Sequence, residues 1–164
     1  MPAPLIRGGG QESRQRSGTE NMTGIAGPAA ALAAVDKEVI WKRRAQALQL
    51  RLEQGLRAIA PDAVIFGEGA DRLPNTTCFA IPGKSAEMLL IAFDLEGIAV
   101  SSGSACSSGK VERSHVLAAM RVSESLSEGA IRVSTGWNSE EADIERFLAA
   151  LAKICRGREA RRAA

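Results

Sequence analysis

The chain has 164 residues, of which 45% are hydrophobic, and this length suits one domain or part of a larger one. Its 21 basic and 19 acidic residues nearly balance, so the net charge of +2 gives no case for nucleic-acid binding as a main role. No apolar run reaches the roughly eighteen residues of a membrane span, and the first residues lack a signal-peptide pattern. We therefore expect a cytoplasmic protein without a membrane partner.

The first sixty residues are expected to form an irregular lead-in followed by helices. Residues 1–24 are rich in Gly, Ser, Arg and Thr and contain three consecutive glycines, which is typical of a segment without regular structure. Residues 25–60 are expected to form linking helices that end before Pro61. The apolar face of the second helix is formed by residues spaced three or four apart: Ala45, Leu48, Leu52, Leu56 and Ile59.

Residues 61–157 mix short strands and helices without a regular strand–helix–strand repeat. Strands are expected at residues 63–66, 76–81, 98–101 and 130–134. Helices are expected at residues 84–96, around 114–120 and from Asn138 onward. These elements favour a small α+β domain in which helices pack on a short, mainly antiparallel sheet. The basic tail, residues 158–164, is expected to be a frayed end.

Two helices show patterns from which a buried face can be predicted. In the helix at 84–96, the predicted buried stripe is Met88, Ile91, Ala92 and Leu95. In the last helix, the predicted buried face is Ile144, Phe147, Leu148, Leu151 and Cys155. Asn138 and Glu141 have the spacing of a capping box, so we expect this helix to begin at Asn138.

The three cysteines are far apart and show neither CxxC spacing nor a disulfide framework. Cys78 alternates with core positions in a strand, and Cys155 falls on the apolar stripe of the last helix, so both are predicted to be inert, buried thiols. Cys106 lies in a Gly/Ser-rich loop, where Lys110 and Arg113 would favour its thiolate. This pattern alone leaves a reactive thiol and a simple linker equally open. The only histidine, His115, is expected to be partly buried, and a His-based metal site is not expected.

Two further segments could bind anions. Arg132 lies between Ile131 and Val133 in a predicted strand, where a guanidinium could hold a carboxylate through two parallel hydrogen bonds. A structural salt bridge or a surface side chain is the alternative for Arg132. Glycines 8–10, followed by hydroxyl residues near a helix start, could hold a phosphate, although no Gly-Lys-Ser/Thr motif closes this run.

Read together, these segments resemble NifS-like cysteine desulfurases of the aminotransferase class V family. GGGQE at residues 8–12 and RSGTEN at 16–21 resemble the segment that follows the cofactor lysine in that family. SSGSAC at 101–106 resembles the active-site cysteine loop, SHVL at 114–117 follows it as expected, and AIRVS at 130–134 resembles the carboxylate-binding strand. The resemblance implies the C-terminal portion of the enzyme, including the small C-terminal domain of a pyridoxal-phosphate-dependent transferase of fold type I.

The resemblance also implies roles for individual residues. The cofactor would be pyridoxal 5'-phosphate, acting as an electron sink, and the substrate would be L-cysteine. Cys106 would take the substrate sulfur as a persulfide and leave L-alanine, while Arg132 would hold the substrate carboxylate. Thr19 would contact the cofactor phosphate from the neighbouring subunit of a homodimer. The acceptor would be an iron–sulfur scaffold or another sulfur acceptor protein, with Cys106 a candidate transient cluster ligand and no resident metal.

The sequence also departs from the family pattern. The family's chain is more than twice as long, and none of the five lysines here follows a Ser-x-His that would mark the cofactor lysine; these are Lys37, Lys42, Lys84, Lys110 and Lys153. Arg121 stands where the family usually has glycine, and Thr135 where leucine is common. We therefore expect a fragment, a truncated gene product or half of a split enzyme, inactive alone.

Other interpretations remain open at this point. The chain could be a cofactor-free sulfur carrier or partner-docking domain that accepts a persulfide on Cys106. It could also be a relative that acts on selenocysteine or kynurenine, although the cysteine loop argues against this. We also expect the helix at 45–59 to leave apolar surface exposed, and the chain to aggregate.

Overall fold

The computed structural model describes residues 3–35, 39–102 and 114–162. The chain divides into two compact units, Met1–Val39 and Ile40–Ala164, and each is described by itself. In the part of the chain that the structure describes, no helix is long and apolar enough to cross a membrane.

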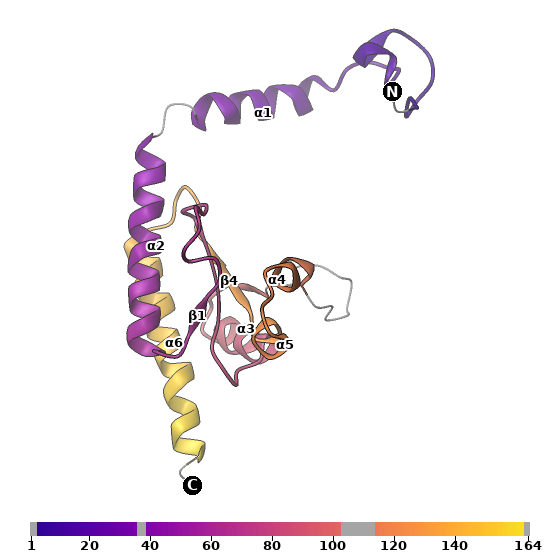
Figure 1. The fold of residues 1–164 in the computed structure, drawn as a ribbon. Coiled ribbons are helices and arrows are strands. Elements are labelled where there is room, and N and C mark those ends of the chain that lie inside the picture. Colours follow the sequence, from indigo (N-terminus) through magenta and orange to yellow (C-terminus); the bar gives the residue numbers. More distant parts are fainter. Residues whose placement is uncertain (1–2, 36–38, 103–113, 163–164) are drawn as a thin grey trace. The chain divides into compact units, whose positions relative to one another are not determined.

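The first unit contains a short turn of 3-10 helix, η1 (Gln11–Arg14), and one α-helix, α1 (Met22–Val35) (Figure 1). The backbone on either side of η1 is joined by a parallel bridge between Ile6 and Arg16. Asn21 caps α1, because its side-chain oxygen accepts a hydrogen bond from the Gly24 N–H at 3.0 Å. A helix was expected from residue 25 onward, and α1 begins three residues earlier, at Met22.

The second unit is built on a four-stranded sheet. Its strands are β1 (Val64–Ile65), β2 (Thr76–Ala80), β3 (Ser101–Ser102) and β4 (Ile131–Ser134), in the order β1-β2-β4-β3. All three neighbouring pairs are antiparallel, which confirms the predicted short antiparallel sheet. The third strand was expected at 98–101, but pairing begins only at Ser101, and Ile98 and Val100 pack against the core instead.

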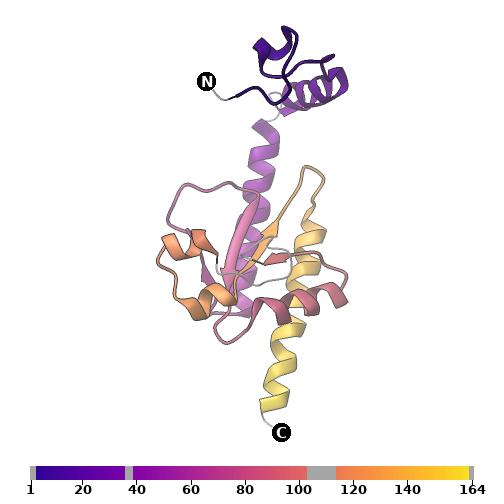
Figure 2. The same ribbon diagram turned by 90° about the vertical axis from the view of Figure 1, so that its right-hand side faces the viewer.

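The larger core lies between one face of the sheet and three helices: α2 (Val39–Ile59), α3 (Ala86–Leu95) and α6 (Glu141–Arg162). Figure 1 shows α2 and α6 on one side of the sheet, and Figure 2 shows the same layers turned by 90°. Phe147 of α6 lies at the centre, stacked on Phe93 with ring centroids 4.8 Å apart and edge-on to Phe79 at 6.4 Å.

The apolar face of α2 is buried within this unit, with Ala45, Leu48, Leu52 and Leu56 each no more than 4% exposed. The stripe that was expected to pack partly against polypeptide outside this chain is instead buried within it, although Leu50 of the same helix is 58% exposed. The expected aggregation stays a prediction. Helix α6 supplies the cover over the stripe. A Cβ on Gly55 of α2 would lie only 2.3 Å from the Leu148 side chain of α6, so the two helices pack closely at this glycine.

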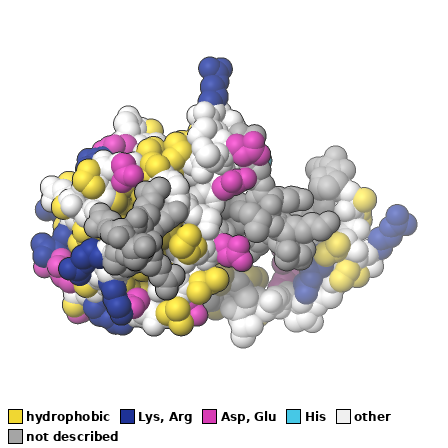
Figure 3. Space-filling view, turned by 90° about the horizontal axis from the view of Figure 1, so that it is seen from below, with side chains coloured by type: hydrophobic (Ala, Val, Ile, Leu, Met, Phe, Trp, Pro, Cys, Tyr) yellow, Lys and Arg dark blue, Asp and Glu magenta, His cyan; other side chains and the backbone are white. Residues whose placement is uncertain are grey.

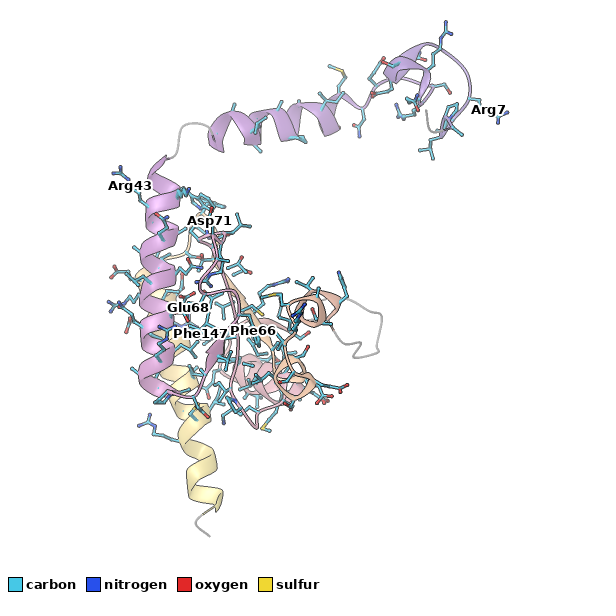
Figure 4. The ribbon with its side chains drawn as sticks, in the orientation of Figure 1. Arg7, Arg43, Phe66, Glu68, Asp71 and Phe147 are labelled. Atoms are coloured by element: carbon cyan, nitrogen blue, oxygen red, sulfur yellow. The ribbon has the colours of Figure 1, made fainter. Side chains whose placement is uncertain are left out.

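A smaller cluster covers the other face of the sheet. It contains Phe66, Ala80, Leu117 and Ala130, and it lies against α4 (His115–Ala119) and α5 (Glu124–Glu128). Phe66 is labelled in Figure 4, and α4 and α5 lie on this side of the sheet in Figure 1. The sequence patterns predicted α4 but not α5, whose single turn is too short for a helical period to be recognised.

The buried face of α3 was predicted wrongly. Its buried residues are Ala86, Leu89 and Phe93, whereas Met88, Ile91 and Leu95 are 47%, 57% and 82% exposed. Because α3 is apolar on both sides, the spacing of its hydrophobic residues fits either face. Stacking of Phe93 on Phe147 decides which side is buried.

The predicted capping box at the start of α6 is also not found. The helix begins at Glu141, three residues later than expected. Its first turn is held by the Asp143 carboxylate, which accepts a hydrogen bond from the Glu140 N–H at 2.9 Å. The predicted buried face of α6 is confirmed at its centre, where Ile144, Phe147 and Leu151 are buried.

Candidate functional site

Arg132 is held at the middle of the sheet by strand β4. Its neighbours Ile131 and Val133 are buried in the larger core, so the alternation of side chains along a strand places Arg132 on the opposite face. That face carries the smaller cluster with Ala80 and Ala130. The predicted orientation of Arg132 relative to its neighbours is therefore found, with its side chain half-buried.

Strand register brings two other polar side chains beside Arg132. Cys78 of β2 and Ser101 of β3 are its direct cross-strand partners, one on each side. Directly opposed residues have Cβ atoms about 4.5–5.5 Å apart and share one face of the sheet. The result is a row, Cys78–Arg132–Ser101, that crosses three strands on the face covered by α4 and α5.

The guanidinium of Arg132 forms no hydrogen bond or ion pair with any of the described residues. This contrasts with Arg72, whose guanidinium makes two hydrogen bonds, of 3.0 and 3.2 Å, to the buried carboxylate of Glu53. The alternative of a structural salt bridge for Arg132 therefore has no partner within residues 3–35, 39–102 and 114–162. A half-buried guanidinium that none of these residues neutralises is suited to binding an anion.

The charge of Arg132 acts on its neighbour Cys78. Burial raises the pKa of the Cys78 thiol, and the positive charge of Arg132 opposes part of this rise. Cys78 is half-buried and packs against the smaller cluster. A thiol with a raised pKa is mostly protonated at neutral pH, which fits the prediction that Cys78 is not a nucleophile.

Cys106 lies outside the described residues, as do Lys110 and Arg113. Ser102, the last described residue of β3, lies four positions before Cys106 in the sequence. The chain resumes at Ser114, which caps α4 by accepting a hydrogen bond from the Leu117 N–H. His115, expected to be partly buried, is instead exposed, because Ser114 and Leu117 occupy the buried side of this short helix.

Thr19 belongs to the first unit, just before α1. It is exposed, and its backbone carbonyl accepts a hydrogen bond from the Arg16 side chain at 3.1 Å. Among the described residues, its hydroxyl has no hydrogen-bond partner. An exposed hydroxyl beside an arginine fits a phosphate group, which accepts hydrogen bonds from both.

A buried network beneath β2 was not foreseen from the sequence. The Glu53 carboxylate of α2 accepts hydrogen bonds from Arg72 and, at 2.9 Å, from the Thr77 hydroxyl. Thr77 precedes Cys78, so this network anchors the strand that lies beside Arg132. No sequence motif marks it, because its members are brought together only by the packing of α2 on the sheet. No group of three or more candidate metal ligands occurs among the described side chains.

The family pattern described as Aminotransferase class-V matches residues 7–147. The chain belongs to this aminotransferase class-V family. It is 44% identical over 154 residues to a protein named cysteine desulfurase from Cereibacter sphaeroides, and 46% identical over 149 residues to one from Gluconacetobacter diazotrophicus. These matches cover 92% and 88% of this chain, but only 38% and 36% of the relatives.

Solved structures agree with this family assignment. The chain matches a NifS-like protein from Rickettsia africae with a TM-score of 0.79 and 39% identity, covering 93% of this chain and 39% of that one. A second structure, titled NifS-like protein, matches with a TM-score of 0.78 and 33% identity. The resemblance to cysteine desulfurases and the predicted portion of a fold-type-I transferase are thus confirmed, although this chain spans under two fifths of its relatives' length.

Proposed function

We propose that this chain supplies the substrate-carboxylate clamp and the sulfur-accepting thiol of a cysteine desulfurase. The proposed reaction removes sulfur from L-cysteine and leaves L-alanine, with the sulfur retained as a persulfide on Cys106. The observation that carries the proposal is the guanidinium of Arg132, which has no partner among the described residues and is held on the sheet beside Ser101, the residue from which the chain continues toward Cys106.

Arg132 is suited to position the amino acid. Its strand is the second of four in spatial order from the β3 edge and is hydrogen-bonded on both sides, so the backbone of Arg132 is held rigidly. A planar guanidinium can donate two parallel hydrogen bonds to a carboxylate and so fix both its place and its orientation. Holding the substrate in one orientation lowers the entropic part of the barrier to sulfur transfer.

Cys106 is proposed as the nucleophile. Its thiolate would attack the substrate sulfur, so that a sulfur–sulfur bond forms as the carbon–sulfur bond breaks. The electron pair of the broken bond stays with the substrate carbon, which takes up a proton to give alanine. The accessible thiolate that this step requires is the reason that Cys106, in its Gly/Ser-rich segment, is preferred over the half-buried Cys78 and Cys155.

The family implies pyridoxal 5'-phosphate as cofactor, and two side chains of the first unit support this part of the proposal. The exposed Thr19 hydroxyl and the nearby Arg16 could hold its phosphate. When bound, the cofactor supplies an electron sink for the substrate carbon. The lysine that attaches the cofactor is proposed to come from polypeptide outside this chain, because no lysine here has the Ser-x-His context expected of it.

The remaining features of the proposal follow from the family. We propose a homodimer in which Thr19 serves the neighbouring subunit's cofactor, a cytoplasmic location, and an iron–sulfur scaffold or another sulfur acceptor protein as the recipient. Use of the sulfur in iron–sulfur cluster or thio-cofactor assembly belongs to the same proposal.

The test is reconstitution. This chain is mixed with a polypeptide comprising the part of a curated relative that it does not match, together with pyridoxal phosphate and L-cysteine, and alanine and sulfide are measured. Arg132→Gln is expected to raise KM for cysteine by about tenfold or more, and Arg132→Lys by less, because lysine keeps the charge but loses the second hydrogen bond. Arg146→Gln, which alters an exposed arginine on α6, is the matched control.

The thiol is tested in the same mixture. Cys106→Ala is expected to abolish alanine formation, whereas Cys155→Ala should retain it. Equal activity of Arg132→Gln and Arg146→Gln would contradict the role of the clamp. Formation of a Cys106 persulfide by an added, active desulfurase, with no alanine produced under any pairing, would favour the alternative of a cofactor-free sulfur carrier.

A further inference from the structure

Helix α3 presents an apolar surface that the rest of this unit does not cover. Met88, Ile91 and Leu95, here named the α3 ridge, are 47%, 57% and 82% exposed. Their spacing places them on one side of the helix, opposite the buried Leu89 and Phe93. Figure 3, which views the molecule from below, shows hydrophobic side chains lying on the surface between charged ones.

The α3 ridge has a charged border of one sign. Glu87 and Asp94 are the only charged residues of α3, both are exposed, and both lie along the same side of the ridge. Neither forms an ion pair with another described residue. Two other charged residues flank the helix. The half-buried Lys84 precedes the cap residue Ser85, and Glu96, just beyond the end of the helix, is paired with Lys153.

We propose that the α3 ridge is a docking surface for a partner protein that presents an amphipathic helix, with an apolar stripe bordered by Lys or Arg. The apolar stripe would bury the ridge, and the basic border would lie along Glu87 and Asp94. Helix-in-groove and helix-on-helix contacts of this kind use residues at the same three- and four-residue spacing as the ridge.

A second copy of this chain fits the surface less well. Two copies of α3 packed antiparallel about a two-fold axis would place Glu87 of one copy opposite Asp94 of the other, where like charges repel. A basic partner helix meets no such conflict. Charge complementarity therefore favours a different protein over self-association.

The position of α3 suggests which partner would use it. The helix packs against β3 and β4, and β3 leads directly into the segment that contains Cys106. A protein docked on α3 would lie close to the strand from which the chain continues toward Cys106, so we assign the surface to the sulfur acceptor. This assignment of the partner rests on the proposed function; the docking surface itself does not.

The first experiment measures binding without any turnover. The probe is a synthetic helix of about 18 residues with leucines along one face and lysines along one border, compared with a version carrying glutamates instead of lysines. We expect the lysine version to bind and to shift the amide NMR signals of α3, with affinity falling as salt rises. The glutamate version should bind more weakly.

Variants of the ridge and its border sharpen this test. Ile91→Ser is expected to weaken binding of the lysine helix by about tenfold, and Glu87→Lys to weaken it and reduce its salt dependence. Leu50→Ser is the apolar control, because Leu50 is 58% exposed on α2. Asp71→Lys is the charge control, because Asp71, labelled in Figure 4, is exposed in the loop before β2. All four positions are exposed, and melting curves check that each variant is folded.

Three results would overturn the docking surface. The first is equal binding of the lysine and glutamate helices, and the second is an equal loss of helix binding in Ile91→Ser and Leu50→Ser. The third is that Ile91→Ser mainly impairs dimer formation or assembly with the complementary polypeptide. Transfer of labelled sulfur from the reconstituted enzyme to an acceptor then tests the assignment of the partner. If Ile91→Ser abolishes binding of the lysine helix but no reconstituted mixture forms alanine, the docking surface is supported and the proposed function is rejected.

Discussion

The end of α4 places an arginine where glycine is favoured, and replacing it should stabilise the protein. Arg121 has φ of +59°, in the left-handed region that residues with a side chain rarely adopt. It follows the cap residue Met120, and the Val122 and Arg121 N–H groups bond back to Leu117 and Ala118. This is a Schellman motif, in which the residue after the cap is usually glycine.

The same motif occurs at the end of α3 with the usual residue. Gly97 has φ of +71°, and the N–H groups of Ile98 and Gly97 bond to the carbonyls of Phe93 and Asp94. The two helix ends therefore form an internal comparison, glycine at one and arginine at the other. Because Arg121 is exposed and forms no hydrogen bond or ion pair with the described residues, its side chain contributes little to offset the backbone cost.

The magnitude follows from two opposing effects. The left-handed conformation costs a residue with a Cβ about 1–2 kcal/mol, while the greater freedom of glycine in the unfolded chain costs about 0.4–1 kcal/mol. Arg121→Gly should therefore raise the free energy of unfolding by about 0.5–1 kcal/mol, or Tm by about 1–4 °C. Gly97→Ala should lower it by about 1 kcal/mol, through the backbone alone, because a Cβ there meets nothing within 4 Å.

Urea and thermal unfolding, followed by circular dichroism, measure both variants. Hydrogen exchange at the Val122 amide reports whether the stabilisation is local to the end of α4, since this N–H bonds to Leu117 at 3.0 Å. A neutral or destabilising Arg121→Gly, together with a neutral Gly97→Ala, would refute the reasoning that left-handed backbone is costly at these positions.

Three further predictions concern the residues around the candidate site. Glu53→Gln should lower the free energy of unfolding, measured by urea titration, by about 2–3 kcal/mol, because the half-buried Arg72 loses its charged partner. The control Arg51→Gln removes an exposed ion pair and should leave the urea midpoint unchanged. Alkylation of Cys78 at about pH 8, followed by mass spectrometry, should be slower in the folded than in the unfolded chain, because burial raises the pKa of this thiol. It should be slower still in Arg132→Gln, because the charge of Arg132 lowers that pKa. Faster alkylation in Arg132→Gln would contradict the second part. The pKa of Cys78 is higher in the folded state than in the unfolded state. The stability that this thiol contributes is therefore present below its unfolded-state pKa and is lost as pH rises through its folded-state pKa. Cys78→Ala should accordingly flatten the decline of the free energy of unfolding at alkaline pH.

Alternation along strands was the most informative signal in the sequence. The pattern of buried Ile131 and Val133 around Arg132 could be predicted because one face of β4 lies against the larger core. The residue that lies beside Arg132 could not be predicted, because the register of the strands depends on pairing between segments some fifty residues apart. The neighbour Cys78 was therefore assigned only to the core, and its electrostatic coupling to Arg132 emerged from the structure.

Helix faces were predictable where only one side is apolar. In α2 the apolar residues form a single stripe, and Leu48, Leu52 and Leu56 are buried as expected. In α3 both sides are apolar, so spacing could not select the buried one, and the exposed side became the α3 ridge. The misassigned face of α3 is thus informative, because it marks hydrophobic surface that local packing does not require.

Within the residues that the structure describes, the two outermost strands of the sheet, Val64–Ile65 and Ser101–Ser102, are each two residues long. Such short borders offer few free backbone groups to which a foreign strand could be added. The exposed hydrophobic side chains of Met88, Ile91 and Leu95 lie on a helix instead. Aggregation in concentrated samples should therefore proceed through contacts between helices. The aggregates should keep the helical circular dichroism signal and lack the X-ray fibre reflection at about 4.7 Å that marks stacked strands.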